Sequence, residues 1–131
     1  VSAEESAQAV VKQVLDRWGH IDMLINNAGI TRDRLLVRMG LDDWDHVLDV
    51  NLRGAVLCTK YVMPQMIRRR TGRIVNISSV AGRTPFPSAA VYSASKSALD
   101  ALSEGLRAEL AKLSVDGPSI RVTSIREWRR R

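Results

Sequence analysis

Three short apolar runs, separated by long amphipathic stretches, constrain the fold of this chain more than any other feature. The runs cover residues 21–26, 73–79 and 120–125, and their length and apolar content are typical of strands. The first of them predicts a buried strand that runs into a tight loop. Strands that alternate with helical stretches are typical of an α/β fold with a parallel sheet. A chain of 131 residues has room for one such domain, or for part of one.

Apolar side chains that recur on one face predict four helices around these strands. The first begins at a capping box that opens with Ser2, and it ends at Gly19. The second begins near Leu41, and the third covers residues 51–70 with a bend at Pro64. The side chains expected to face inward are Val10, Val11, Val14, Leu15 and Trp18 in the first helix, Trp44, Val47 and Leu48 in the second, and Leu99, Leu102, Leu106, Leu110 and Leu113 in the last.

Composition excludes several classes of protein. Cys58 is the single cysteine, so no disulfide can form within the chain, and we expect a reducing, cytoplasmic compartment. His20 and His46 have no cysteine or second histidine at ligand spacing, so no metal site is predicted. No stretch reaches the roughly 18 uncharged apolar residues of a membrane span. The chain starts without methionine and shows no targeting signal, so we expect its natural start upstream, with an organellar location if that part carries a signal.

Charge raises one further hypothesis. The chain has 20 basic and 14 acidic residues, a net charge of +6, of which residues 126–131 contribute +3 through four arginines and one glutamate. Arginine runs there and at residues 68–70 suggest nucleic-acid binding. The run at residues 68–70 directly follows a helical pattern, and cations stabilise the carboxyl end of a helix. A solvated helix end is therefore the better interpretation, and nucleic acid is not among the expected partners.

Polar side chains suited to carbonyl chemistry occur in a distinctive order along the chain. The segment Asn26-Asn27-Ala28-Gly29 follows the first strand, at the edge where open α/β sheets bind ligands. Asn51 stands at the start of the third helix, and Ser79 closes the second strand. Tyr92 and Lys96 stand four residues apart at the start of the last helix, so the phenol and the amine share one helix face.

This set is suited to proton transfer to a carbonyl. A free tyrosine has a pKa of about 10, which is too high for efficient proton transfer at neutral pH. A lysine ammonium one turn away favours the phenolate and brings that pKa toward the working range. A serine hydroxyl can donate a hydrogen bond to the developing oxyanion. Taken singly, each residue also has a structural interpretation, as a chance helix pair, a cap, a kink or a turn, and only their joint order and spacing favour catalysis.

With these motifs the sequence resembles the short-chain dehydrogenase/reductase family over residues 2–125. The step of 13 residues from Ser79 to Tyr92 and the step of 41 residues from Asn51 to Tyr92 match the usual spacing of that family. Residues 26–39, which read NNAGITRDRLLVRM, are especially similar to bacterial-type 3-oxoacyl-(acyl-carrier-protein) reductases, enzymes of fatty acid biosynthesis. The resemblance implies part of a Rossmann-type, doubly wound parallel sheet.

The resemblance also implies a role for each motif residue. Tyr92 would be the general acid that protonates the carbonyl oxygen during reduction. Lys96 would lower the pKa of Tyr92 and bond the ribose next to the nicotinamide. Ser79 would orient the substrate carbonyl, and Asn51 would hold a water in the proton relay with Lys96.

A cofactor and a substrate follow from the same resemblance. Asn26, Ala28 and Gly29 would lie along the cofactor, together with Tyr92 and Lys96. The cofactor would be NADP or NAD, with NADP favoured by the subfamily, and its nicotinamide would deliver a hydride. The substrate would be a small carbonyl compound such as a 3-oxoacyl thioester, held by a carrier protein.

Two departures from the family predict a fragment. The glycines stand at positions 19, 29, 40, 54, 72, 82, 105 and 117, so no glycine-rich cofactor loop can exist. After residue 125 a basic tail replaces the family's substrate part. We therefore divide the chain into a catalytic portion, residues 1–125, and a tail, residues 126–131. On its own, such a chain should bind the cofactor weakly or not at all.

A non-catalytic remnant that associates with full-length relatives is the second hypothesis. In the family that this sequence resembles, the helices at residues 51–70 and 91–113 form a dimer bundle. The resemblance therefore implies a homo-oligomer through these helices, and a remnant would keep that surface. Nucleic-acid binding through the arginine runs is the third hypothesis, which a steep salt dependence of DNA binding would support.

Overall fold

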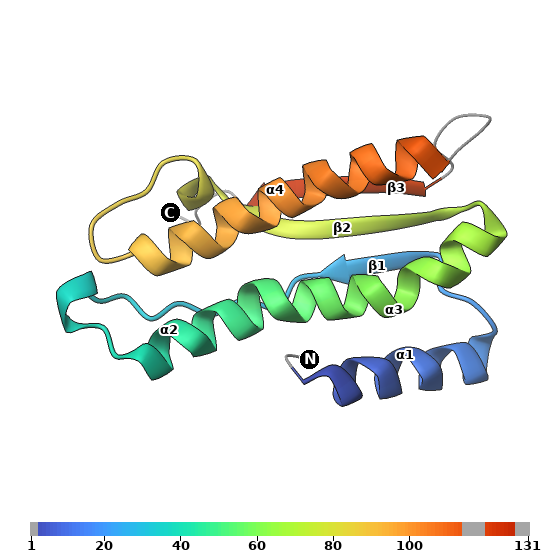
Figure 1. Ribbon diagram of the computed structural model, residues 1–131, viewed down its shortest axis with the longest axis horizontal. Helices are drawn as coiled ribbons and strands as arrows, with labels where there is room; N and C mark the ends of the chain where they lie inside the picture. Colours follow the sequence, from blue (N-terminus) through green and yellow to red (C-terminus); the bar gives the residue numbers. More distant parts are fainter. Residues whose placement is uncertain (1–2, 114–119, 128–131) are drawn as a thin grey trace.

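Three parallel strands form the sheet of this protein. The computed structural model describes residues 3–113 and 120–127, and within them the strands lie in the order β1 (Met23–Asn26), β2 (Gly72–Ser79) and β3 (Ile120–Glu127). Met23 pairs with Arg73 on one side of β2, and Ile120 pairs with Gly72 on the other. The carboxyl ends of all three strands therefore meet at one edge of the sheet (Figure 1).

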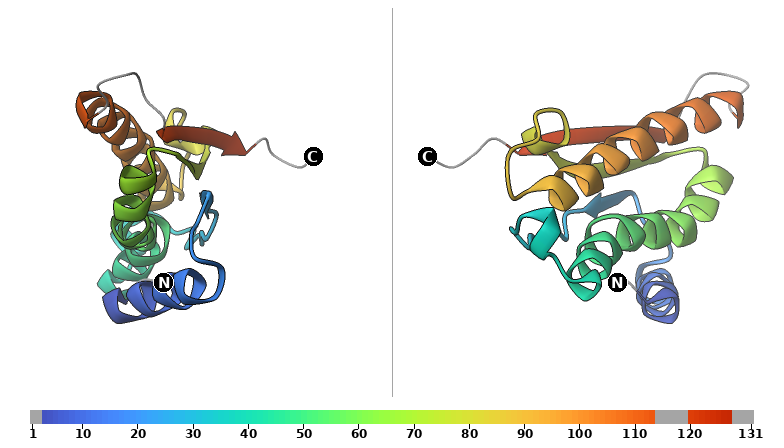
Figure 2. Two further views of the ribbon diagram at one scale, coloured as in Figure 1. Left: turned by 90° about the vertical axis from the view of Figure 1, so that its right-hand side faces the viewer. Right: turned by 60° about the vertical axis from the view of Figure 1, so that its left-hand side comes forward.

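Four α-helices pack on one side of the strands (Figure 2). They are α1 (Glu4–Trp18), α2 (Leu41–Leu48), α3 (Gly54–Arg69) and α4 (Ala90–Leu113). Three short turns, η1 (Leu36–Arg38), η2 (Asp49–Arg53) and η3 (Val80–Gly82), join them to each other and to the strands. This alternation of helices with parallel strands confirms the predicted α/β class.

The third predicted helix differs from expectation at its start. α2, the π-helical turn η2 and α3 follow one another without a break from Leu41 to Arg69. Pro64 lies inside α3, which continues through it to Arg69. The irregular turn of this long helix therefore contains Asn51, one of the predicted site residues. A π-helical turn inserted in an α-helix is often found at a functional site.

The expectation that the first strand is buried is wrong. Met23 is 49% exposed and Ile25 is 55% exposed. Within the described residues β1 pairs with β2 alone, and the helices cover only one face of the sheet. Val75 and Ile77 of β2 and Ile125 of β3 are likewise half-buried or exposed on the other face. The apolar run was recognised correctly, but its neighbours leave it open to water.

Periodicity also misplaced several helix side chains. Ala7 and Val11 are the buried residues of α1, whereas Val10 and Trp18 are exposed. Trp44 of α2 and Leu113 at the end of α4 are exposed as well. These residues do repeat at helical spacing, but they lie at positions that the neighbouring elements cover only in part. The expected cap on Ser2 lies outside the described residues, and the helix begins at Glu4, whose carboxylate accepts hydrogen bonds from α3.

The apolar core lies between the helices and the inner face of the sheet. It is built from side chains of α1, α3, β2, α4 and β3: Val11, Val62, Met66, Ile74, Leu106, Leu110, Ile120 and Val122. A chain of polar contacts crosses this core at Asn76, which is fully buried. Asn76 donates to the hydroxyl of Ser103 at 2.8 Å and accepts from the amide of Asn26 at 2.8 Å. These directional bonds set how β1, β2 and α4 lie against one another.

The third strand is longer than expected and takes up two residues of the predicted tail. β3 continues through Arg126 to Glu127, where the apolar pattern had indicated an end at residue 125. Arg126 and Glu127 pair with Ser78 and Ser79 of β2. The remaining tail residues, 128–131, lie outside the described residues.

Two glycines of the α4 region should respond in opposite directions to a methyl group. A Cβ on Gly82 would lie 3.0 Å from the main-chain carbon of Lys96 and 3.1 Å from the amide nitrogen of Ser97, which are helix backbone atoms that cannot yield. A Cβ on Gly105, inside α4, would meet no atom within 4 Å. We expect Gly82→Ala to lower the free energy of unfolding by about 1–3 kcal/mol, and Gly105→Ala to raise it by about 0.5–1 kcal/mol.

Urea unfolding followed by tryptophan fluorescence measures both effects. An unchanged or increased stability of Gly82→Ala would show that η3 does not pack against α4 as described.

Candidate active site

The carboxyl ends of β1 and β2 bring the predicted residues into one neighbourhood. A Cβ placed on Gly29, in the loop after β1, would lie 3.4 Å from Nζ of Lys96 and 3.7 Å from Oδ1 of Asn51. Gly29, η2 and the first turns of α4 therefore meet at this edge of the sheet. A Cβ at Gly29 would be in ordinary van der Waals contact with the end of the Lys96 side chain, so the loop after β1 lies directly beside it.

Lys96 lies at the centre of this neighbourhood. Its side chain reaches from α4 to the end of β2, where Nζ donates a hydrogen bond to the carbonyl oxygen of Ile77 at 2.7 Å. The residue is 3% exposed, so its charge is removed from water and must be held by nearby dipoles. Nζ also lies 5.8 Å from the centre of the Tyr92 ring, within reach of the electron-rich face of that ring. The predicted Tyr92–Lys96 pairing on one helix face is present in the structure.

Asn51 clamps the loop after β1. Its side-chain oxygen accepts from the amide of Ile30 at 2.7 Å, and its side-chain nitrogen donates to the carbonyl of Ile30 at 2.9 Å. The same nitrogen donates to Oγ of Ser95 at 3.0 Å, and Ser95 in turn donates to the carbonyl of Tyr92 at 2.7 Å. The side chain of Asn51 is therefore occupied in joining the loop to α4, and its main chain is the part that remains to hold a water.

Ser79 ends β2 and caps the turn that follows. Its Oγ accepts a hydrogen bond from the amide of Ala81 at 3.2 Å. Because the hydroxyl is the acceptor in that contact, its own proton remains to be donated to a ligand. Ser79 stands two residues after Ile77, which anchors Lys96, so it belongs to the same end of β2.

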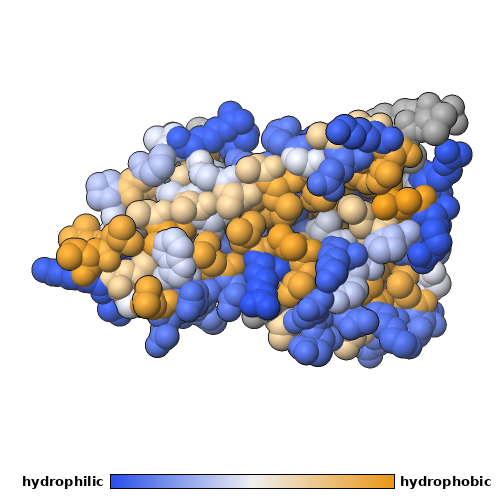
Figure 3. Space-filling model, viewed as in Figure 1, coloured by the Kyte–Doolittle hydropathy of each residue, from blue (hydrophilic) through white to orange (hydrophobic). Residues whose placement is uncertain are grey.

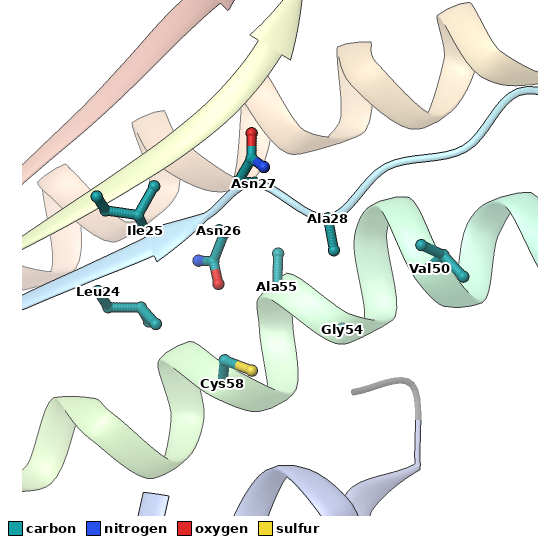
Figure 4. Close-up of a pocket in the computed structure, with 9 residues that line it drawn as sticks. All are labelled: Leu24, Ile25, Asn26, Asn27, Ala28, Val50, Gly54, Ala55 and Cys58. Carbon is teal, nitrogen blue, oxygen red and sulfur yellow. The ribbon is translucent and has the colours of Figure 1, made fainter. Parts of the chain in front are cut away.

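The side-chain amide nitrogen of Asn26 bonds two other elements of the protein. The amide nitrogen donates to Oδ1 of Asn76 at 2.8 Å and to Oγ1 of Thr59 at 3.2 Å. Figure 4 shows this side chain turned toward α3, on the side opposite to that of Asn27. These two bonds hold the half-buried side chain of Asn26 between β2 and α3.

Asn27 and Ala28 line a small apolar pocket between the end of β1 and the start of α3 (Figure 4). Its other walls are Leu24, Ile25, Asn26, Val50, Gly54, Ala55 and Cys58. Its volume of about 90 Å³ is well below the roughly 300 Å³ at which ligand pockets begin. Burial raises the pKa of the Cys58 thiol, which favours the unreactive form and a packing role for this residue.

Sequence reasoning missed two members of the site. Ser95 is fully buried and links Asn51 to the Tyr92 turn. The carbonyl of Ile77 anchors Lys96. A polar residue between Tyr92 and Lys96, in a helix that packs on an apolar core, was the available signal for Ser95. No side-chain pattern marks a main-chain carbonyl, so Ile77 could be found only from the fold.

Residues 3–113 and 120–127 contain neither a metal-ligand cluster nor a helix suited to a membrane. In that part of the chain no three histidine, cysteine, aspartate or glutamate side chains gather closely enough to hold a metal ion. No described helix combines the length and the apolar character required to cross a bilayer.

Curated proteins similar to this chain include 3-oxoacyl-[acyl-carrier-protein] reductases. A 3-oxoacyl-[acyl-carrier-protein] reductase from a Synechocystis species is 45% identical over 115 residues, which is 88% of this chain and 47% of that protein. One from Thermotoga maritima is 44% identical over 125 residues, which is 95% of this chain and 49% of that protein. The chain thus spans about half the length of the curated relatives it matches.

Solved structures and a family model agree with that relationship. A short-chain dehydrogenase from Streptomyces avermitilis has a TM-score of 0.91 at 33% identity, covering 99% of this chain and 47% of that one. A gluconate 5-dehydrogenase from Burkholderia cenocepacia, in complex with NADP and tartrate, has a TM-score of 0.86 at 33% identity. The match covers 94% of this chain and 46% of that one. A family model described as short chain dehydrogenase matches residues 1–126. Tyr92 and the buried Lys96 lie on one face of α4, as the motif predicts. This chain belongs to the short-chain dehydrogenase family.

Proposed function

We propose that the protein containing these residues reduces the keto group of a 3-oxoacyl thioester to a hydroxyl, with NADPH as the reductant. The placement of Lys96, anchored on Ile77 and 5.8 Å from the centre of the Tyr92 ring, carries this proposal. The substrate class is supported by relatives of 44–45% identity that are named 3-oxoacyl-[acyl-carrier-protein] reductases. The cofactor is supported by the NADP in the gluconate 5-dehydrogenase structure.

Tyr92 is the proposed general acid. When bound, NADPH supplies the hydride, and Tyr92 donates its phenolic proton to the carbonyl oxygen that becomes negative in that step. The Lys96 ammonium stabilises the phenolate that is left behind, because opposite charges attract strongly where water is excluded. Ser79 donates its hydroxyl proton to the same oxygen and orients it. Tyr92 and Ser79 therefore act on the same oxygen of the substrate, and Lys96 acts through Tyr92.

The proton that Tyr92 loses must be replaced from solvent. We assign the relay water to the main-chain carbonyl of Asn51, since the side chain of that residue is engaged by Ile30 and Ser95. Asn51 thereby has a second task, which is to hold the loop after β1 in place beside Lys96. Both tasks depend on the π-helical turn η2 that carries it.

The residues of this chain suit one half of the cofactor. Lys96, whose ammonium reaches the end of β2 from α4, would bond the ribose beside the nicotinamide, and Ala28 and Gly29 would form the wall along which the cofactor lies. The pyrophosphate half requires a glycine-rich loop at a helix N-terminus, and the glycine spacing of these 131 residues forms none. The pocket at Ala28, of about 90 Å³, agrees with partial rather than complete binding.

The outer surface of α3 and α4 is proposed to bind a second copy of the chain. An apolar groove of about 260 Å³ lies between these helices, and it appears as an orange band across the face in Figure 3. It is lined by Val56, Thr59, Lys60, Met63, Pro64, Ile67, Leu102 and Leu106. The same helices form the dimer bundle in the family that the sequence resembles. A remnant without catalytic activity would keep this surface, which is why association with full-length relatives is retained as the alternative function.

Removal of the Tyr92 hydroxyl tests the proposed reaction. In a polypeptide that joins these residues to a glycine-rich dinucleotide-binding half, we expect Tyr92→Phe to lower kcat for ketone reduction at least about 100-fold, because the proton donor is lost. Tyr61→Phe is the matched control, since Tyr61 is the other of the two tyrosines and its phenol bonds Glu4 on the surface. NADPH consumption at 340 nm measures both. Equal turnover of Tyr92→Phe and Tyr61→Phe would remove Tyr92 from the reaction.

The 131-residue chain alone should bind NADPH weakly. Its three tryptophans provide the signal, and we expect less than half-saturation of fluorescence quenching at about 100 µM NADPH, since the pyrophosphate has no helix N-terminus to meet. A dissociation constant in the low micromolar range would show that these residues form a complete cofactor site.

A charge placed in the groove tests the dimer. Val56 in the groove is 39% exposed and Val10 on α1 is 53% exposed, so glutamate fits at either position without entering the core. We expect size-exclusion chromatography with light scattering to show a dimer for the unaltered chain and for Val10→Glu, and a monomer for Val56→Glu. A dimer that survives Val56→Glu would place the interface elsewhere.

A further inference from the structure

α4 is tied to the sheet at a second point, one helical turn beyond Lys96. Asp100 follows Lys96 by four residues, so both side chains lie on the face of α4 that meets the sheet. Figure 1 shows α4 lying along β2 and β3. The Asp100 side chain is 17% exposed, which is low for a carboxylate and indicates a built contact rather than a solvated one.

The carboxylate of Asp100 reaches both strands. Oδ1 accepts from the hydroxyl of Ser124 on β3, and Oδ2 lies 3.4 Å from Nε of Arg126, two residues further along the strand. The hydroxyl of Ser78, which stands opposite Arg126 in the β2-β3 ladder, donates to the main-chain oxygen of Lys96 at 3.3 Å and lies close enough to the carboxylate to help lower the pKa of Asp100. Asp100 thus joins α4, β2 and β3 where both strands end.

The two charges of this contact depend on each other. Oδ2 of Asp100 and Nε of Arg126 are both buried, and in the described part of the chain neither has a hydrogen-bond partner. Burial alone would raise the pKa of Asp100, but hydrogen bonds from Ser124 and Ser78 and the charge of Arg126 outweigh it and hold the pKa below its usual value. Asp100 is therefore ionised at neutral pH, and loss of either partner leaves a buried charge without its counterpart.

We propose that Asp100 and Arg126 are a positioning pair that holds the Tyr92–Lys96 turns of α4 against the end of β2, so that the Lys96 ammonium stays at the carbonyl of Ile77. Its importance for catalysis rests on the proposed function above, whereas its effect on Lys96 does not. Arg126 was expected in a separate tail, but its side chain belongs to the neighbourhood of the site.

Another contact between α4 and β3 offers a matched comparison. Nε of Arg107 donates to the carbonyl of Val122 at 2.7 Å, seven residues along α4 from Asp100 and further from Lys96. Glu104 lies on the exposed side of the same helix, where it pairs with Arg107. Loss of the Arg107 contact weakens the attachment of α4, and loss of Glu104 removes one negative charge, but neither acts beside Lys96.

Competitive acetylation of the folded chain, read by mass spectrometry, measures the reactivity of Lys96 against the exposed Lys12, Lys60 and Lys112 as internal references. We expect Asp100→Asn to raise the acetylation rate of Lys96 at least about tenfold, because the turn that carries Lys96 opens more often. Arg126→Gln should do the same. The double variant should exceed neither single variant, since the two residues act through one contact.

The controls distinguish positioning from general stability. Arg107→Gln and Glu104→Gln should leave the Lys96 rate within about twofold of the unaltered chain. Urea unfolding of every variant shows whether Lys96 reactivity merely follows the free energy of unfolding. An unchanged Lys96 rate in Asp100→Asn, or an equal rise in an Arg107→Gln variant of equal stability, would overturn the proposal.

A milder substitution tests the proposal if the Asp100→Asn variant does not fold. Ser124→Ala keeps both charges and removes one hydrogen bond to Asp100, so it should raise the Lys96 rate by a smaller factor, and no rise would count against the proposal. Neither cofactor nor substrate enters these measurements. Failure of the reductase assignment would therefore leave this result standing, and failure here would leave that assignment untouched.

Discussion

The buried ammonium of Lys96 is the interaction on which the rest of the site depends. A charge that is 3% exposed is costly unless oxygen dipoles replace the water it has lost, and the carbonyl of Ile77 at the end of β2 is such a dipole. This requirement fixes how α4 lies against the sheet. It also limits what can stand nearby, because a Cβ on Gly82 would lie 3.0 Å from the main-chain carbon of Lys96.

Polar contacts in the interior fix the positions of the loop and the strands around Lys96. Asn51 holds the loop after β1 through both main-chain groups of Ile30, and Asn76 links β1 to α4 through Asn26 and Ser103. Hydrogen bonds of this kind add little net stability, but they penalise any other arrangement that would leave a buried donor or acceptor unpaired. The apolar core supplies the cohesion, and these amides determine the positions at which the loop, the strands and α4 meet.

The order of elements and the main members of the site could be predicted from the sequence, because both depend on the spacing of residues that are close together in the chain. Apolar runs bounded by helical stretches located the strands, and helical spacing put Tyr92 and Lys96 on one face. The failures arose where an answer depended on distant segments. Whether Ile25 is buried depends on what lies beside β1, and whether Trp18 faces inward depends on which other helix its face meets. Neither is encoded in the local period of the sequence.

The roles of individual side chains were also predicted only where they depend on nearby residues. The motif marked Asn26 and Asn51 as important, but it did not distinguish an amide that faces a ligand from one that bonds the interior. Only the fold shows that Asn26 bonds Asn76 and that Asn51 bonds Ile30. Arg126 was assigned to a tail by composition, and its partner Asp100, 26 positions earlier, could not be identified without β3 lying beside α4.

The convergence of Gly29, Asn51 and Lys96 at one edge of the sheet is tested most directly by nuclear Overhauser effects in the labelled chain. The structure predicts cross-peaks between the α protons of Gly29 and the ε protons of Lys96, and between the side-chain amide of Asn51 and the main-chain amide of Ile30. Absence of both sets of cross-peaks in a folded sample, with the ε protons of Lys96 averaged as in a solvated side chain, would contradict the account of the site.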